Sequence, residues 1–179
     1  LIQISTDCVF SGRKGFYNEN DIPDSHDIYG QTKALGEALY ERSLTIRTST
    51  IGHELITSNG LLEWFLKQEQ CDGFSQAIFS GLTTLELSKI IVDYIIPKSN
   101  LHGLFHVGSN PISKYELLKI ISKYYKKNVH INPSNKLKID RSLDSRLFQN
   151  KTGYKPLDWD KLIQNMLKEY RYEKFSNYR

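Results

Sequence analysis

Residues 27–37 read DIYGQTKALGE, and this stretch decides how the rest of the sequence is interpreted. Tyr29 and Lys33 are four residues apart, so on an α-helix they lie one turn apart on the same face. A phenol normally keeps its proton up to about pH 10, and a neighbouring ammonium lowers that pKa because it stabilises the phenolate. The pair therefore predicts a proton donor or acceptor that works near neutral pH. Alone, the spacing is weakly specific, since a solvated helix face gives the same pattern.

Strand-like segments lie on both sides of this helix. Residues 1–4 (LIQI) predict a buried strand that ends at Ser5, Thr6 and Asp7, and residues 44–49 (LTIRTS) predict a second strand. Strand, helix and strand within about 50 residues form a βαβ unit with parallel strands. Ligands bind beyond the carboxyl ends of such strands, so the hydroxyls of Ser5 and Thr6 are placed to touch a substrate. The alternative is that they cap the strand end by bonding local backbone.

The remaining elements follow from apolar periodicity and turn residues. The predicted strands are 74–80, 103–108 and an edge strand over 129–131, with a turn at Asp72 and Gly73 before the first of them. The predicted helices run from Gly60 to Leu66, from 140–144 to Gly153, and from Trp159 to about Tyr170. Two more helices begin at capping boxes, one formed by Thr83 and Glu86 and the other by Ser113 and Glu116. Gly30 and Gly36 each cost the first helix roughly 1 kcal/mol against alanine, which predicts a close approach by another backbone or a ligand.

Composition and charge exclude several classes of protein. The 179 residues suffice for one domain with a core, and 24 basic against 20 acidic side chains give a net charge of +4. The basic side chains are too dispersed to predict nucleic-acid binding, and no apolar run approaches the roughly 20 residues of a membrane span. Two cysteines do not make a disulfide framework, and five histidines show no metal-ligand spacing. We therefore predict no metal site and a reducing, cytoplasmic environment.

Seven segments together resemble one family. They read STDCVFSG (5–12), YGQTKALGE (29–37), IRTS (46–49), GLTT (81–84), GLFHV (103–107), SKYE (113–116) and RSLD (141–144). In this combination they are similar to the extended short-chain dehydrogenase/reductases, and most of all to nucleotide-sugar reductases of the dTDP-4-dehydrorhamnose reductase type. The resemblance implies an α/β fold. Residues 1–52 would form the C-terminal part of a Rossmann-like parallel sheet, 53–170 mainly a smaller α/β substrate-binding lobe, and 171–179 a flexible tail.

The resemblance also implies three catalytic residues. Thr6 matches the Ser or Thr that hydrogen-bonds the substrate carbonyl or hydroxyl. Tyr29 matches the acid that protonates this oxygen as hydride arrives, and Lys33 matches the residue that holds the nicotinamide ribose and lowers the pKa of the tyrosine. Reduction of a keto sugar puts negative charge on oxygen, so two hydrogen-bond donors and a nearby cation agree with this chemistry.

Binding residues are implied in the same way. Thr48 and Ser49 match a strand end whose backbone lies near the nicotinamide, so with the tyrosine and lysine they would contact the cofactor, NADP or NAD. Thr50 matches a position that faces the sugar, and Arg141 matches a contact to the substrate nucleotide. The implied reaction is NAD(P)H-dependent reduction of the 4-keto group of a nucleotide-linked deoxysugar, in polysaccharide precursor synthesis.

Two alternatives stay open. The first is a nucleotide-sugar epimerase or dehydratase, although dehydratases carry extra carboxylates beside the threonine and here only Asp7 follows Thr6. The second is a non-catalytic regulatory subunit of the same fold, which the joint presence of Thr6, Tyr29 and Lys33 disfavours.

The glycine-rich fingerprint that cradles a dinucleotide does not occur in this sequence. We therefore expect a fragment that lacks its N-terminal part and binds cofactor poorly by itself. Such a fragment would expose an open sheet edge, which favours self-association, for example as a homodimer.

Overall fold

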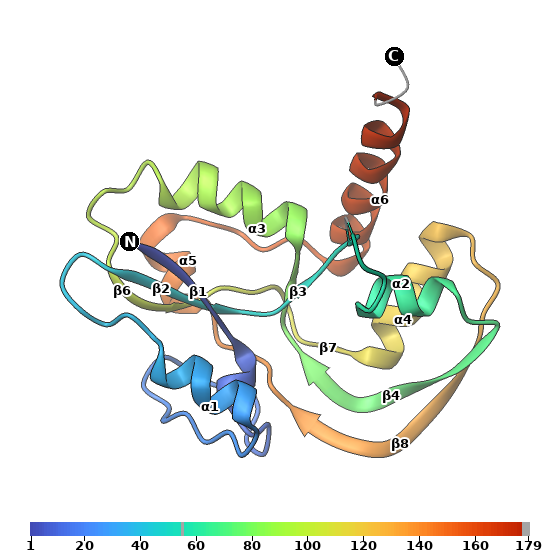
Figure 1. Ribbon diagram of the computed structural model, residues 1–179, viewed down its shortest axis with the longest axis horizontal. Coiled ribbons are helices and arrows are strands. Elements are labelled where there is room, and N and C mark those ends of the chain that lie inside the picture. Colours follow the sequence, from blue (N-terminus) through green and yellow to red (C-terminus); the bar gives the residue numbers. More distant parts are fainter. Residues whose placement is uncertain (55, 177–179) are drawn as a thin grey trace.

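Two main sheets organise the molecule, one in each lobe of the computed structural model (Figure 1). The structure describes residues 1–54 and 56–176, and for residues 173–176 it describes the backbone only. A short sheet of β3 (Thr50–Ile51) and β5 (Leu82–Thr83) lies between the two lobes. The predicted α/β class with parallel strands is confirmed.

The first lobe has three parallel strands with helices on both faces. Its sheet has the order β1 (Ile2–Thr6), β2 (Leu44–Thr48), β6 (Gly103–His106). In Figure 1, α1 (Ile28–Leu35) lies below this sheet, and α3 (Thr84–Ile90) lies above it with its π-helical continuation (Ile91–Ile95). The short helix α5 (Arg146–Thr152) also packs on β6. The core between the strands and these last helices contains Leu44, Ile46, Leu82, Ile90, Phe105 and Phe148.

The second lobe packs three helices on a mixed sheet. Its strands are β7 (Ile112–Ser113), β4 (Gln70–Phe79) and β8 (His130–Asp140), in that spatial order, and its helices are α2 (Leu61–Leu66), α4 (Lys114–Tyr125) and α6 (Trp159–Ser176). β4 is parallel to β8 and antiparallel to β7. The core of this lobe contains Leu62, Phe65, Leu117, Ile121, Leu162 and Ile163, all fully buried.

Local chemistry sets the start of α1. The Asp27 carboxylate accepts the Gly30 N–H at 2.7 Å, which satisfies one of the free donors at the helix start. A Cβ on Gly30 would lie 2.1 Å from the Cys8 carbonyl oxygen, so the predicted close approach by another backbone is confirmed there. Gly36 is different, because it is the C-terminal cap of α1 and lies outside the helix.

Both predicted capping boxes are confirmed as helix starts. The Thr83 hydroxyl accepts the Glu86 N–H at 3.3 Å at the start of α3, and the Ser113 hydroxyl accepts the Glu116 N–H at 3.1 Å at the start of α4.

Two predicted elements in the sheet of the second lobe differ from the structure. The turn predicted at Asp72 and Gly73 is wrong, because both residues belong to β4, where Gly73 packs closely against Ile131 of β8. The edge strand predicted over 129–131 is much longer and runs to Asp140, at the edge of its sheet, where a proline such as Pro133 is tolerated.

The helices near the C-terminus also have other bounds than predicted. α5 begins at Arg146, after the predicted 140–144, because β8 occupies the chain as far as Asp140. The last helix runs beyond Tyr170 to Ser176, so most of the predicted tail 171–179 is helical, and 177–179 lie outside the described residues. Within the described part of the chain, no helix combines the length and the apolar character that a membrane span requires.

Candidate active site

The site forms where β1 and β2 end. The parallel register places Thr6 directly beside Thr48, and both side chains are buried. Ser49 follows β2 at the same edge, and a single 3-10 turn (Asp7–Val9) follows β1. The hydroxyl-bearing residues expected at a ligand site therefore lie next to each other at the carboxyl edge of the sheet.

Helix α1 runs antiparallel to β1 along its side. Near the start of the helix, Gly30 touches the backbone of Cys8, and one turn later the Lys33 Nζ donates to the Ile4 carbonyl at 2.8 Å. Tyr29 directly precedes Gly30, so it belongs to the part of α1 that approaches the turn after β1, which begins next to Thr6. The Tyr29 side chain is 57% exposed, so its phenol is accessible from solvent.

The Thr6 hydroxyl has two local partners. It donates to the Asp7 carboxylate at 3.2 Å and accepts the Cys8 N–H at 3.1 Å, which caps the 3-10 turn. The capping role that the sequence left open is therefore present. The hydroxyl can donate to a ligand oxygen only by releasing Asp7. Burial raises the pKa of the Asp7 carboxyl above its ordinary value, while the Thr6 bond and the cations Lys114 and Arg141 oppose that shift.

Arg141 joins the end of β8 to this site. Its Nε donates to the Phe10 carbonyl at 2.9 Å, its Nη1 lies 3.3 Å from the Cys8 sulfur, and its Nη2 lies 3.4 Å from the Asp27 carboxylate. The residue expected to contact the substrate nucleotide therefore holds the turn after β1 and the start of α1. One guanidinium fixes both elements that carry the hydroxyl and the phenol.

A buried ion pair supports the sheet below the site. Glu37, just beyond α1, accepts from Arg47 Nε and Nη2, both at 2.7 Å, and also accepts the Ser5 hydroxyl at 2.7 Å. Each partner of the ion pair is only 3% exposed. Bidentate geometry and a third hydrogen bond compensate the desolvation of the two charges. The pair therefore fixes the chain after α1 against β1 and β2.

His106 extends this network into β6. Arg47 can only donate, so the His106 Nε2 accepts from its Nη1 at 3.4 Å, and Nδ1–H donates to the Tyr17 carbonyl at 3.0 Å. Burial lowers the pKa of His106 to about 4, and the Arg47 charge acts in the same direction. The imidazole is therefore neutral at pH 7. Burial also raises the pKa of the Glu19 carboxyl, which accepts a hydrogen bond from the backbone N–H of His106.

An apolar cavity of about 480 Å³ opens beside the strand ends. Its polar rim includes Asp7, Cys8, Ser49 and Arg141. We call it the apolar cavity; its walls are formed by Leu61, Trp64, Phe74, Ala77, Ile78, Phe79, Leu118, Leu137 and Ile139. Its size and composition suit a small organic ligand. Thr50, expected to face the sugar, lines a neighbouring pocket of about 230 Å³ that shares Leu61 and Phe79 with the apolar cavity.

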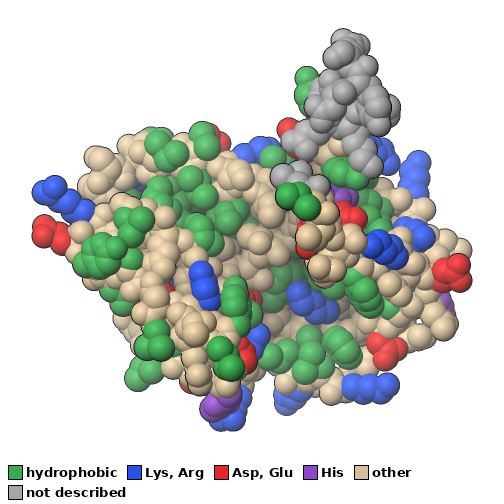
Figure 2. Space-filling view, in the orientation of Figure 1, with side chains coloured by type: hydrophobic (Ala, Val, Ile, Leu, Met, Phe, Trp, Pro, Cys, Tyr) green, Lys and Arg blue, Asp and Glu red, His purple; other side chains and the backbone are tan. Residues whose placement is uncertain are grey.

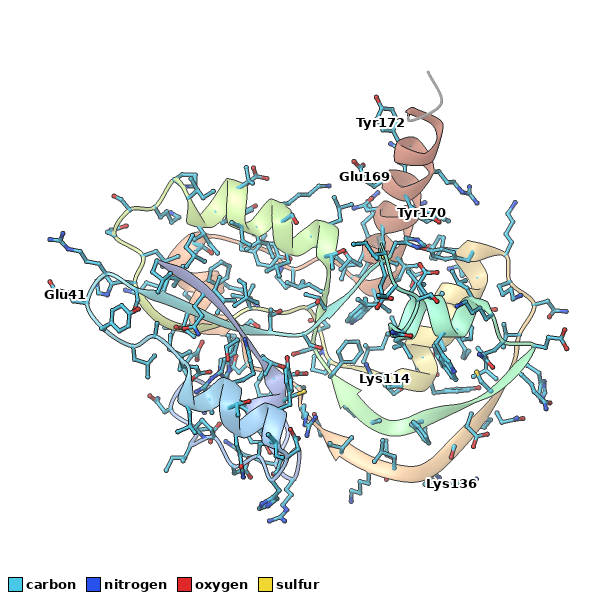
Figure 3. The ribbon with its side chains drawn as sticks, in the orientation of Figure 1. Glu41, Lys114, Lys136, Glu169, Tyr170 and Tyr172 are labelled. Atoms are coloured by element: carbon cyan, nitrogen blue, oxygen red, sulfur yellow. The ribbon has the colours of Figure 1, made fainter. Side chains whose placement is uncertain are left out.

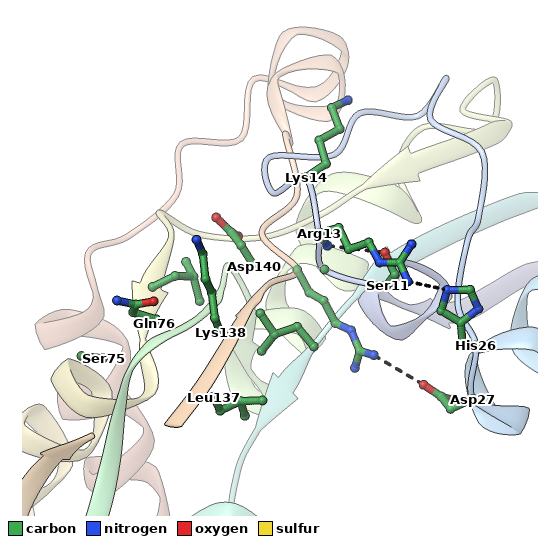
Figure 4. A pocket seen from close by; sticks show the side chains of 14 residues that line it. Ser11, Arg13, Lys14, His26, Asp27, Ser75, Gln76, Leu137, Lys138 and Asp140 are labelled. Atoms are coloured by element: carbon green, nitrogen blue, oxygen red, sulfur yellow. Dashed lines mark hydrogen bonds and ion pairs between the residues drawn. The ribbon is translucent and has the colours of Figure 1, made fainter. Parts of the chain in front are cut away.

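A larger hollow, about 1080 Å³, shares Arg141 and Ile139 with the apolar cavity in its lining (Figure 4). Arg13 and Lys138 line it together with Asp140, and the dashed lines in Figure 4 mark the contacts of Arg13 with His26 and of Arg141 with Asp27. Figure 2 shows basic and hydrophobic side chains together in a hollow between the two lobes.

Comparison with known families agrees with this geometry. The family model described as "RmlD substrate binding domain" matches residues 1–172. This chain belongs to the RmlD substrate-binding domain family.

This RmlD domain is similar in sequence and in structure to several known proteins. It is 25% identical to a dTDP-4-dehydrorhamnose reductase of Aggregatibacter actinomycetemcomitans over 93% of the chain and 65% of that protein. It is 34% identical to the spore coat polysaccharide biosynthesis protein SpsK of Bacillus subtilis over 67% of the chain and 44% of that protein. A Clostridium acetobutylicum dTDP-4-dehydrorhamnose reductase structure matches with a TM-score of 0.82 at 21% identity, over 95% of this chain and 65% of that one. The chain therefore spans less than two thirds of the length of these relatives.

Several residues at or below the site of this RmlD domain were not predicted from the sequence. Glu37, Arg47 and Lys114 lie inside the quoted motifs, but the motifs indicate no role for them. The sequence contains one signal for the Glu37–Arg47 ion pair. A charged residue in the middle of the apolar strand 44–49 requires a buried partner, because an isolated buried charge is costly. The sequence does not indicate which carboxylate provides it.

Proposed function

We propose that this chain supplies the substrate-binding lobe and the catalytic residues of an NAD(P)H-dependent reductase. The reaction would convert the 4-keto group of a nucleotide-linked deoxysugar to a hydroxyl. The observation that supports it most is the packing of α1 along β1, in which Gly30 approaches Cys8 and the Lys33 Nζ donates to the Ile4 carbonyl, while the neighbouring Tyr29 is exposed. A phenol and a hydroxyl on neighbouring elements can donate to one carbonyl oxygen.

In this mechanism the two donors have distinct roles. Tyr29 transfers its phenolic proton to the sugar oxygen as that oxygen gains negative charge. Thr6 releases Asp7 and donates a hydrogen bond to the same oxygen, which orients the carbonyl and stabilises the charge. Lys33 lies one turn from Tyr29 on the same face, held by the Ile4 carbonyl, so its positive charge favours the phenolate left behind.

The residues proposed to bind the cofactor lie on α1 and at the carboxyl edge of the first sheet. Solved neighbours include a Bacillus anthracis dTDP-4-dehydrorhamnose reductase in complex with NADP and the Bordetella bronchiseptica enzyme WbmG in complex with NAD and UDP. Here Tyr29, Lys33, Thr48 and Ser49 would hold the nicotinamide end, which fits an accessible phenol on α1 and two hydroxyl-bearing residues at the end of β2. When bound, the cofactor supplies hydride to the carbonyl carbon. The glycine-rich fingerprint does not occur in this sequence, so we assign only this end to the chain.

The wider setting is also a proposal. The name of the SpsK relative supports a role in polysaccharide precursor synthesis, with a nucleotide sugar as the partner in the cytoplasm.

A second candidate is a non-catalytic subunit of the same fold. A segment of 37 residues, 21% of the chain, is 54% identical to methionine adenosyltransferase 2 subunit beta of Danio rerio. That name supports a partner-binding role. The two candidates differ in one property, because only the reductase requires the Tyr29 phenol for turnover.

The test is an NADPH oxidation assay on the full-length protein with a panel of nucleotide-linked 4-keto-6-deoxysugars. We expect turnover with at least one of them, and a loss of about 10²–10⁴-fold in Tyr29→Phe, since this is the usual contribution of a general acid. Tyr40→Phe is the matched control, because Tyr40 is an exposed tyrosine beyond the end of α1. No turnover with any substrate, or equal turnover in Tyr29→Phe and Tyr40→Phe, would show that the reductase proposal is wrong.

A further inference from the structure

Lys114 occupies an unusual position for a lysine. It is the first residue of α4, and it lines both the apolar cavity and the smaller pocket that contains Thr50. Figure 3 shows it near the middle of the molecule, whereas Lys136 lies at the outer margin on β8. Of the two lysines, only Lys114 is therefore at the junction of the cavities on the reacting side of the fold.

The surroundings of Lys114 satisfy its charge but not its hydrogen bonds. Its Nζ lies 3.6 Å from the centre of the Phe79 ring, and the Asp7 carboxylate is close enough to interact electrostatically. Burial lowers the pKa of the Lys114 ammonium, and Asp7 opposes that shift. Among the side chains that the structure describes, none accepts a hydrogen bond from Nζ. An ammonium has three donors, and a half-buried one normally finds acceptors.

A ligand can supply the missing acceptors. The apolar cavity has aromatic walls at Trp64 and Phe74, which suit a flat base, and its rim carries the cations Lys114 and Arg141. Arg141 already commits three of its five guanidinium donors to Phe10, Cys8 and Asp27, whereas Lys114 offers an ammonium whose donors have no acceptor among the described side chains. An anionic group bound there would lie between the aromatic walls and the strand ends of β1 and β2.

We propose that Lys114 binds the diphosphate of the nucleotide-linked substrate, with the base in the apolar cavity and the sugar toward Thr6 and Thr50. This inference rests on the proposed function, because it concerns the same substrate. It adds a substrate-binding residue that the motifs did not indicate. It also gives a reason for a lysine over the Phe79 ring, at a position where an apolar side chain would cost less to bury.

Binding measurements separate this role from a purely structural one. Isothermal titration of the chain with dTDP, UDP and thymidine uses probes that differ in phosphate and base, and it requires no turnover. Lys114→Met keeps the apolar stem over Phe79 and removes the charge. We expect it to lose at least about tenfold in affinity for the nucleoside diphosphate, as for a charge-assisted hydrogen bond, with thymidine affinity unchanged. Lys136→Met is the matched control, because the Lys136 side chain is 82% exposed.

A second measurement needs no variant. Reductive methylation of the wild-type chain followed by mass spectrometry should show Lys114 protected by dTDP or UDP and not by thymidine, while Lys136 reacts equally in all samples. Equal diphosphate affinity in Lys114→Met and wild type, or no protection of Lys114, would overturn this inference and leave the reductase proposal intact. Failure of the wild-type chain to bind dTDP and UDP would overturn both the inference and the proposed substrate class.

Discussion

The buried ion pair below the site provides a stringent test of the structure. Glu37 accepts three hydrogen bonds, two from Arg47 and one from Ser5, and both charged side chains are 3% exposed. Glu37→Gln keeps the shape but leaves the Arg47 guanidinium charged and uncompensated in the interior. Breaking a buried pair in this way costs about 3–5 kcal/mol in the free energy of unfolding. For a chain of this length that corresponds to a fall of roughly 6–20 °C in Tm.

Urea unfolding followed by circular dichroism measures this change directly. The matched control is Glu116→Gln, which removes one partner of an exposed pair with Lys119, 50% and 51% exposed, and should cost less than about 0.5 kcal/mol. The double variant Glu37→Leu with Arg47→Met should lose less stability than Glu37→Gln alone, because no charge remains buried. If Glu37→Gln lies within about 1 kcal/mol of the control, the pair is not buried as described.

Two further predictions concern packing and pH. Gly30→Ala should destabilise the fold by about 1–3 kcal/mol in urea unfolding, because its Cβ would lie 2.1 Å from the Cys8 carbonyl oxygen. Gly36→Ala is the control and should be nearly neutral. Equal effects of the two substitutions would contradict the close approach of α1 to Cys8. Burial lowers the pKa of His106 from 6.5 to about 4, so its contribution is fully present above pH 6.5 and is lost as the pH falls toward 4. The urea midpoint should therefore fall more steeply between pH 6.5 and 4 in wild type than in His106→Gln, and parallel curves would refute this.

Local sequence signals predicted the starts of three helices and the first two strands well. Asp27 before α1, and the capping hydroxyls of Thr83 and Ser113, act within three residues of their partners, so a short window contains all that is needed. The strands β1 and β2 follow from short segments rich in Ile, Leu and Thr, in which β-branched residues favour strands. Gly30 was informative because a glycine destabilises a helix relative to alanine, which predicted that another part of the chain packs closely against it.

The second lobe was harder to predict because its strands depend on distant partners. The polar segment 130–140 has little strand propensity, and it becomes β8 by pairing with β4, about 60 residues earlier in the chain. The same pairing makes a strand of Asp72 and Gly73, which in isolation favour a turn. The Glu37–Arg47 pair and the position of Lys114 likewise arise from contacts between separate elements, which no local pattern specifies.

The central claim is that the Thr6 hydroxyl and the Tyr29 phenol act on one oxygen atom. A double-mutant cycle on kcat/KM tests it most directly, with Thr6→Val, Tyr29→Phe and the double variant in the full-length protein, each checked for folding by urea unfolding. We expect losses of about 10²-fold and 10²–10⁴-fold for the single variants. If both groups serve the same oxygen, the double variant should lose little more than Tyr29→Phe alone. Losses that multiply would show that the two residues act independently and would contradict the account.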